Sequence, residues 1–286
     1  MPDSSISITP SPGLYIVATP IGNLGDLTVR AAAVLKSADV IAAEDTRVTA
    51  KLMRHLGAKV PLIAYHDHSD AAVRDALVAR AASKVVALVS DAGTPLISDP
   101  GYKLVREARA AGRHVVTLPG PCAAIAALTL AGLPTDRFLF AGFLPSKAKA
   151  RGDSIAELAS IRATLVFYES GPRLSATLAA LAAGLGNRDA AVARELTKLY
   201  EECVTGPLAD LAALYANSPP KGEIVVVVAP PPSDTAEDGN EADIDAALAE
   251  SLETLPVAKA AKAVAGRFGR ERSDIYARAL ALKGSA

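Results

Sequence analysis

Two acidic segments of the chain follow apolar runs that have the length of β-strands. Glu44-Asp45-Thr46-Arg47 comes directly after Asp39–Ala43, and Glu169 comes directly after Thr164–Tyr168. Carboxylates and a guanidinium at the ends of buried strands favour the handling of a polar substrate. The alternative for Glu44 and Asp45 is a helix start, where the helix dipole stabilises acidic side chains. We take these residues as catalytic candidates: Glu44, Asp45, Arg47 and Glu169.

Loops rich in glycine and proline follow three other predicted strands. They begin after Ala18, Val89 and Leu118, and the middle loop reads SDAGTP. Glycine and proline there let the backbone approach a small molecule closely, and open α/β sheets bind ligands where their parallel strands end. The loops match neither GxGxxG nor GxxxxGK[ST], which disfavours a dinucleotide or a P-loop nucleotide. We expect a small-molecule site where several of these loops converge.

Histidine and cysteine do not form a pattern typical of metal ligands. His66 and His68 flank Asp67 without further ligands at matching spacing, so a loop that leads into a helix is favoured and no metal is expected. Cys122 stands at an expected helix start, where a thiolate would be activated; without an obvious histidine partner, we interpret it as a small residue packed beside ligand. Cys203 is expected in the core. Two cysteines in 286 residues fit a reducing cytoplasm.

The elements that position these residues alternate between apolar strands and amphipathic helices in the first half of the chain. This alternation predicts an α/β fold with a mainly parallel sheet that is covered on both faces. The second half mixes hairpin-like strand pairs with helices, which predicts a mixed sheet. The strands expected in the first half are Leu14–Ala18, Asp39–Ala43, Pro61–Tyr65, Val85–Val89 and His114–Leu118.

Changes in composition divide the chain into five segments. Residues 1–12 are polar and lack a basic n-region and an apolar h-region, which predicts a disordered tail and no signal peptide. Residues 13–132 form an N-terminal α/β lobe and residues 133–229 a C-terminal α/β lobe. Residues 230–242 include the acidic, proline-rich PPPSDTAEDGNE and form a linker. Residues 243–286 form a small helix-turn-helix-like domain.

The last segment differs from the rest of the chain in charge. From Pro256 onward it carries seven Lys and Arg against Glu271 and Asp274. Its pattern predicts a helix, a short turn near Gly266–Arg270, and a second helix with Ser273 as N-cap. Because the whole chain has a net charge of only −1, any nucleic-acid surface must be local, and this segment is the candidate. The alternative is a solvated basic face.

A membrane partner is not expected, because no apolar run approaches the roughly 20 residues of a membrane span.

Taken together, the motifs resemble the ribosomal small-subunit RNA methyltransferase I branch of the tetrapyrrole methylase superfamily. They cover about Leu14 to Ala229, and the basic tail resembles the branch's C-terminal helix-turn-helix. The tetrapyrrole-acting relatives carry GxGPGD and GGDP instead. The motifs, in chain order, are LYIVATPIGNLGDLT, AAEDTR, LVSDAGTPLISDPG, LPGPCA, FYESGPR, ARELTKLYEE and KGEIVVVV.

The resemblance implies the two-lobed tetrapyrrole methylase fold, with S-adenosylmethionine in the cleft between the lobes of a homodimer. Cys122 stands where Ser or Thr is usual, and Thr94 replaces an acid of the tetrapyrrole-acting branch. The cofactor-binding residues implied by the motifs are Ile21, Asp91, Ala92, Gly93, Thr94, Ile97, Cys122, Ala123, Tyr168, Glu169 and Leu196.

The implied reaction is methylation of the ribose 2′-hydroxyl of a cytidine in the decoding region of 16S rRNA within the small ribosomal subunit. A ribose hydroxyl is a weak nucleophile, so a nearby base would help, and Glu44, Asp45 and Glu169 are candidates. Arg47 suits an RNA phosphate. In-line positioning without a strong base remains open. Two other hypotheses are a tetrapyrrole C-methyltransferase and a transcription regulator in which a helix-turn-helix is joined to a small-molecule sensor.

Overall fold

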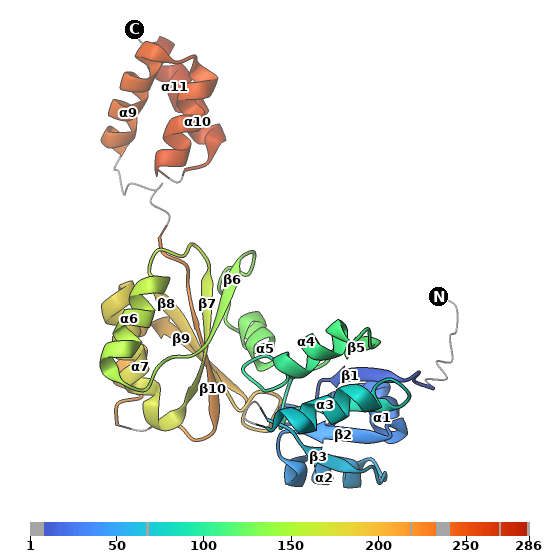
Figure 1. Ribbon diagram of the computed structural model, residues 1–286. Coiled ribbons are helices and arrows are strands. Elements are labelled where there is room, and N and C mark those ends of the chain that lie inside the picture. The colour runs from blue at the N-terminus through green and yellow to red at the C-terminus, as the bar shows by residue number, and fades with distance from the viewer. Residues whose placement is uncertain (1–8, 67–68, 218, 233–240, 269, 285–286) are drawn as a thin grey trace. The chain divides into compact units, whose positions relative to one another are not determined.

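The structure is a computed structural model, and it describes residues 9–66, 69–217, 219–232, 241–268 and 270–284. It separates into two compact units, Met1–Pro230 and Pro231–Ala286 (Figure 1). Most of the expected disordered tail, and residues 233–240 of the expected linker, lie outside the described residues.

The first sheet of the first unit is wholly parallel, with the strand order β3-β2-β4-β1-β5. Its central strands are short runs of valine, isoleucine, leucine and alanine, which suit a strand buried on both faces. The strands are β1 (Gly13–Val17), β2 (Val40–Ala43), β3 (Leu62–Ala64), β4 (Val85–Val89) and β5 (Val115–Leu118).

Helices cover both faces of this sheet, as the sequence pattern predicts. On one face, α1 (Val29–Ser37) and α2 (Thr46–His55) pack against side chains such as Val17 and Ile41. On the other face, α3 (Ala71–Arg80) and α4 (Tyr102–Ala110) pack against side chains such as Leu88. Because neighbouring strands of this sheet are all parallel, the carboxyl ends of the five strands lie at one edge of the sheet.

The second sheet is mixed, with the order β6-β7-β10-β8-β9. Strands β6 and β7 are parallel, and the other neighbouring pairs are antiparallel. The predicted fold class, a parallel-sheet lobe followed by a mixed-sheet lobe, is thus confirmed. The strands are β6 (Phe138–Phe143), β7 (Thr164–Ser170), β8 (Asp189–Arg194), β9 (Glu202–Pro207) and β10 (Glu223–Val228).

Two different sets of helices cover the second sheet. One face carries α6 (Ala148–Leu158), α7 (Gly171–Leu185) and α8 (Leu208–Leu214). The opposite face carries α5 (Ala123–Leu130), whose buried residues pack against β7, β8 and β10. A helix that the sequence places at the end of the N-terminal lobe therefore covers the sheet of the C-terminal lobe and ties the two lobes together.

The second unit contains three helices, α9 (Glu241–Thr254), α10 (Val257–Phe268) and α11 (Arg272–Gly284). Leu248, Val264, Phe268 and Ile275 are buried in its small core. Arg278 of α11 is paired with carboxylates of α9, which fixes the first helix against the third.

This unit corrects two boundaries predicted from the sequence. The expected linker, 230–242, ends too late, because α9 begins at Glu241; acidic residues in a first helical turn are favoured by the dipole. Ser273 was predicted to be an N-cap, but α11 begins at Arg272 and Ser273 lies within its first turn. The helix-turn-helix pair α10 and α11 also has a preceding helix that the sequence pattern of the tail did not reveal.

Among the described residues, no helix is both long enough and apolar enough to cross a membrane.

Candidate functional site

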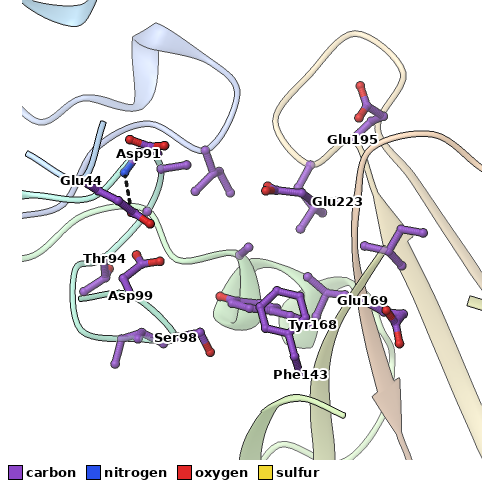
Figure 2. A pocket seen from close by; sticks show the side chains of 18 of the residues that line it. Glu44, Asp91, Thr94, Ser98, Asp99, Phe143, Tyr168, Glu169, Glu195 and Glu223 are labelled. Atoms are coloured by element: carbon purple, nitrogen blue, oxygen red, sulfur yellow. Dashed lines mark hydrogen bonds between the residues drawn. The ribbon is translucent and has the colours of Figure 1, made fainter. Parts of the chain in front are cut away.

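A cavity lies where the strand ends of the first sheet face β7 and β10 of the second sheet (Figure 2). Its wall combines apolar and small residues with an excess of acidic side chains, and Lys198 is the basic residue among them. The acidic residues that line it are Glu44, Asp91, Asp99, Glu169, Glu195 and Glu223.

Backbone geometry shapes the wall formed by the loop after β4. Gly93 has φ +77°, a conformation that side-chain-bearing residues rarely adopt, and it forms a two-way backbone bridge with Thr19 of 2.9 and 3.0 Å. The Thr94 hydroxyl donates a hydrogen bond of 3.0 Å to the Pro121 carbonyl. These contacts bring together the three loops that follow β1, β4 and β5.

Among the residues that the structure describes, four with side chains have positive φ, and all four lie in two loops beside the cavity. Leu96 and Ser98 belong to the loop after β4, whereas Glu195 and Thr197 belong to the loop after β8. Such conformations cost free energy and cluster at functional sites. Ser98 and Glu195 line the cavity directly, so its shape depends on strained backbone held by the surrounding fold.

Glu44 and Asp91 join the loops after β2 and β4. The Glu44 carboxylate accepts a hydrogen bond from the Asp91 backbone N–H, and the Asp91 carboxylate accepts one of 2.9 Å from the Asp45 N–H (Figure 2). Both side chains therefore line the cavity and also fix the register between the two loops.

Asp45 and Arg47 form a local pair at the start of α2. Asp45 is the N-cap of α2 and accepts a hydrogen bond from the Arg47 N–H. Its geometry therefore agrees with the alternative given above, in which Asp45 belongs to a helix start. Its carboxylate lies 2.6 Å from the guanidinium of Arg47, which lowers the pKa of Asp45 to about 2. The Arg47 side chain is 87% exposed and lies outside the cavity lining. It remains accessible to a large anionic partner.

Glu169 is 2% exposed, and much of its hydrogen-bonding capacity is used within the second lobe. Its carboxylate accepts hydrogen bonds from the Thr177 hydroxyl at 2.6 Å and the Ser170 N–H at 2.8 Å. The Arg173 guanidinium lies 3.2 Å from it. A carboxylate held this way orders the turn between β7 and α7, and a proton-transfer role gains no support from its partners.

Tyr168 forms the floor of the cavity between two phenylalanines. Its ring makes edge contacts with Phe140 and Phe143 at centroid distances of 4.8 and 5.6 Å. Its hydroxyl accepts a hydrogen bond from the Ala124 N–H, and burial raises its pKa. At neutral pH Tyr168 is therefore a neutral, oriented wall residue.

The two cysteines lie on the α5 side of the second sheet. Cys122 is the N-cap residue of α5 and lines a neighbouring hollow beside Ile21, Pro121 and Thr197. Cys203 packs against the core on the α5 face, as predicted, and burial raises the pKa of its thiol.

Most of the site residues predicted from the sequence meet at this cavity. Those that do not line it are Asp45, Arg47 and Cys122. The predicted residues that line it are Ile21, Glu44, Asp91, Ala92, Gly93, Thr94, Ile97, Ala123, Tyr168, Glu169 and Leu196.

Sequence reasoning missed several residues that line the cavity. Among them, Asp99 has the carboxyl group whose pKa is shifted most. Burial raises the pKa of Asp99 to about 6, with further contributions from the charges of Glu44, Asp91 and Glu223. Asp99 belongs to the motif SDAGTPLISDPG, the loop after β4 that the sequence analysis had singled out, so its place in that motif was a signal that could have found it. Glu223 and Phe143, by contrast, reach the cavity from the second sheet, and their positions require the tertiary fold.

The described residues contain no group of three His, Cys, Asp and Glu side chains that could hold a metal ion. His66 is described, whereas Asp67 and His68 lie outside the described residues.

The two-lobed fold is that of a methylase family. The sequence profile described as Tetrapyrrole (Corrin/Porphyrin) Methylases matches residues 13–212. Diphthine synthase has the same fold, with a TM-score of 0.59, 20% identity, and coverage of 76% of this chain and 89% of that one. A uroporphyrin-III-C-methyltransferase from Thermus thermophilus has a TM-score of 0.54 and 24% identity, with coverage of 76% and 94%.

Sequence similarity to curated proteins identifies one branch of this methylase family. Ribosomal RNA small subunit methyltransferase I of Erythrobacter litoralis is 58% identical over 273 residues, which are 96% of each chain. The protein of the same name from Escherichia coli O157:H7 is 46% identical over 95% of this chain and 96% of its own length. Residues 238–283 match the profile of the RsmI C-terminal HTH domain. The chain therefore belongs to the ribosomal RNA small subunit methyltransferase I family within the tetrapyrrole methylases.

Proposed function

We propose that this protein transfers the methyl group of S-adenosylmethionine to the ribose 2′-hydroxyl of a cytidine in the decoding region of 16S rRNA. The observation that carries the proposal is the 58% identity to a ribosomal RNA small subunit methyltransferase I along 96% of both chains, which includes the C-terminal unit. A tetrapyrrole C-methyltransferase would share the two lobes, but the solved relatives of that kind match the fold alone at 24% identity or less.

The cavity suits S-adenosylmethionine in both shape and charge. Gly93 and the small residues Ala92 and Ala123 leave room for close backbone approach, while Ile21 and Leu196 offer apolar contact. The carboxylates that line the cavity favour a cationic ligand, and this cofactor carries a sulfonium and an ammonium group against one carboxylate. When bound, it supplies an electrophilic methyl group, and the chain supplies alignment and electrostatics.

Residues outside the cavity are assigned to binding of the RNA substrate. The exposed guanidinium of Arg47 is placed to hold an RNA phosphate outside the cavity. Lys259 and Lys262 lie on the exposed side of α10, opposite the buried Ala261 and Val264, and present positive charge to a second stretch of RNA. We therefore assign substrate capture to Arg47 and the second unit, and methyl transfer to the cavity.

The proposal includes a cytoplasmic homodimer. Leu199 is 87% exposed and Tyr200 is 74% exposed, side by side in the loop before β9, and we assign this pair to the dimer contact. Light scattering of the purified protein tests the dimer, and a monomer at micromolar concentration would contradict it.

The function is tested with methyl-labelled S-adenosylmethionine and small ribosomal subunits from a strain that lacks this enzyme. Label is expected on the 2′-oxygen of one cytidine, located by nuclease digestion and mass spectrometry. Naked 16S rRNA and uroporphyrinogen serve as parallel acceptors. Label in uroporphyrinogen would support a tetrapyrrole methylase, and cofactor binding without transfer to any acceptor would support the regulator hypothesis.

A further inference from the structure

The carboxylates that sequence reasoning offered as bases all hold structural positions. Glu44 accepts a hydrogen bond from the Asp91 backbone, and Asp45 caps α2 while it pairs with Arg47. Glu169 is buried among Thr177, Ser170 and Arg173. These hydrogen bonds and ion pairs give each of the three carboxylates a role in holding the local backbone or a neighbouring side chain.

Asp99 differs from these residues in position and in partners. It lies in the loop after β4, directly after the positive-φ residue Ser98, and Figure 2 shows its carboxylate among the groups that surround the cavity. It is partly buried and lines the cavity. Glu44 and Asp91 face it from the first lobe, and Glu223 faces it from the second. Tyr168, Glu169, Glu195 and Lys198 complete the ring of titratable side chains around the same cavity.

We propose that Asp99 is the general base that accepts the proton of the ribose 2′-hydroxyl during methyl transfer. The inference rests on the proposed function and names a residue for its chemical step. It follows from the cavity that we assign to the cofactor, because Asp99 lines that cavity from the loop after β4 and a methyl acceptor bound there would lie in the same space.

The step balances without a further reactant. The ribose 2′-oxygen forms a bond to the methyl carbon, the carbon–sulfur bond breaks, and its electron pair stays on sulfur as a neutral thioether. The hydroxyl proton passes to the Asp99 carboxylate, which becomes a neutral carboxylic acid. In this step the cofactor loses its positive charge and Asp99 loses its negative charge. The net charge inside the cavity is therefore unchanged.

The ionisation of Asp99 supports this role. A pKa raised to about 6 leaves the carboxylate charged at neutral pH but makes it a stronger base than an exposed aspartate. The efficiency of a general base is greatest when its pKa lies near the working pH. Neighbouring acids and burial therefore tune the group toward proton transfer.

The test compares the wild type with Asp99→Asn, which keeps the shape and removes the base. At saturating cofactor and subunits, kcat is expected to fall at least about 100-fold, within the range that general bases contribute. The cofactor Kd from calorimetry is expected to stay within about threefold. Asp153→Asn, on the exposed face of α6, serves as the matched control and should keep the wild-type kcat.

Two pH measurements make the test independent of a single variant. In the wild type, kcat/KM is expected to rise with pH around a midpoint of about 6, and Asp99→Asn should lack this limb. Glu223→Gln should move the midpoint to lower pH, because one negative charge that faces Asp99 is removed. Carboxyl-carbon NMR of the free protein should show the Asp99 titration at the same midpoint.

Several outcomes would overturn the proposal. Wild-type kcat in Asp99→Asn, an unchanged pH limb, or a variant that loses cofactor affinity while kcat is preserved would each exclude Asp99 as the base. If Asp99→Asn fails to fold, the wild-type pH profile decides: a profile without a midpoint near 6 would also overturn the proposal. A wild-type protein that transfers no methyl to ribose would instead refute the proposed function.

Discussion

The hydroxyl of Tyr168 accepts a hydrogen bond of 3.3 Å from the backbone N–H of Ala124, and this bond joins β7 to the first turn of α5. The N–H belongs to a helix start, where backbone donors have no partner within the helix. Tyr168 thereby serves two purposes, because its ring lines the cavity while its hydroxyl anchors the helix that connects the lobes.

We predict that Tyr168→Phe lowers the free energy of unfolding by about 1 kcal/mol, since the Ala124 N–H loses a partner in a partly buried place. Chemical unfolding by urea measures the change. Tyr102→Phe is the matched control, because Tyr102 is 64% exposed, and it should leave stability unaltered. Equal stability of the two variants would show that the hydrogen bond contributes little.

Gly93→Ala is expected to reduce cofactor affinity at least tenfold as measured by calorimetry. The new Cβ would be 3.4 Å from Ile21, in a backbone conformation of φ +77° that alanine disfavours, so the cofactor loop must shift. Gly112→Ala imposes the same strain at φ +68° with open space around it, in the turn before β5. That control should lose stability while it keeps affinity, and a similar loss of affinity in both variants would refute the assignment.

Arg47→Ala is expected to weaken binding to the small subunit and to leave the cofactor Kd unchanged. Loss of one phosphate contact should reduce the slope of log K against log salt by about 1. Arg54→Ala removes the same charge from the other end of α2 and should preserve the slope. Filter binding at several salt concentrations decides between them, and identical slopes for both variants would mean that Arg47 serves only its pair with Asp45.

The raised pKa of Asp99 carries a prediction about stability. Its folded-state pKa of about 6 exceeds the unfolded value of about 4, so the folded protein binds the proton more tightly. The contribution of Asp99 to stability should therefore be lost as pH rises from 4 to 6, so the stability of Asp99→Asn relative to the wild type should increase over this range. Above pH 6, the variant should be more stable by up to about 3 kcal/mol. A variant that is less stable than the wild type at pH 7.5 would contradict this direction.

The double substitution of Lys259 and Lys262 by alanine is expected to weaken binding of the small subunit and to reduce its salt slope by about 1 to 2. Methyl transfer at saturating subunit concentration should be preserved, because a linked basic module raises local RNA concentration without entering the chemistry. Alanine at Lys36 and Lys103, which lie exposed on α1 and α4, removes the same charge from the first unit. Equal salt slopes for both double variants would show that α10 has no special part in binding.

The sequence by itself determined the class of fold and identified many of the residues that line the cavity. Short runs such as Val85–Val89 can only be strands buried on both faces, and the turn-rich loops after them must gather at one edge of a parallel sheet. The resemblance of the motifs to a known family pointed to the loop residues Ile21, Gly93 and Thr94, and these residues line the cavity because they follow the strands that place them there. The local charge and helical pattern of the tail likewise identified the basic helices α10 and α11.

Only the tertiary structure decided which acids accept hydrogen bonds from the protein and which face other acids across the cavity. Glu44, Asp45, Glu169 and Asp99 are equivalent as carboxylates in the sequence, but the first three hold backbone or side-chain donors that folding brings to them. Asp99 instead meets Glu223 from the other sheet, a residue more than 100 positions away. Long-range electrostatics and burial depend on the packing of distant segments, and a one-dimensional pattern carries no measure of either.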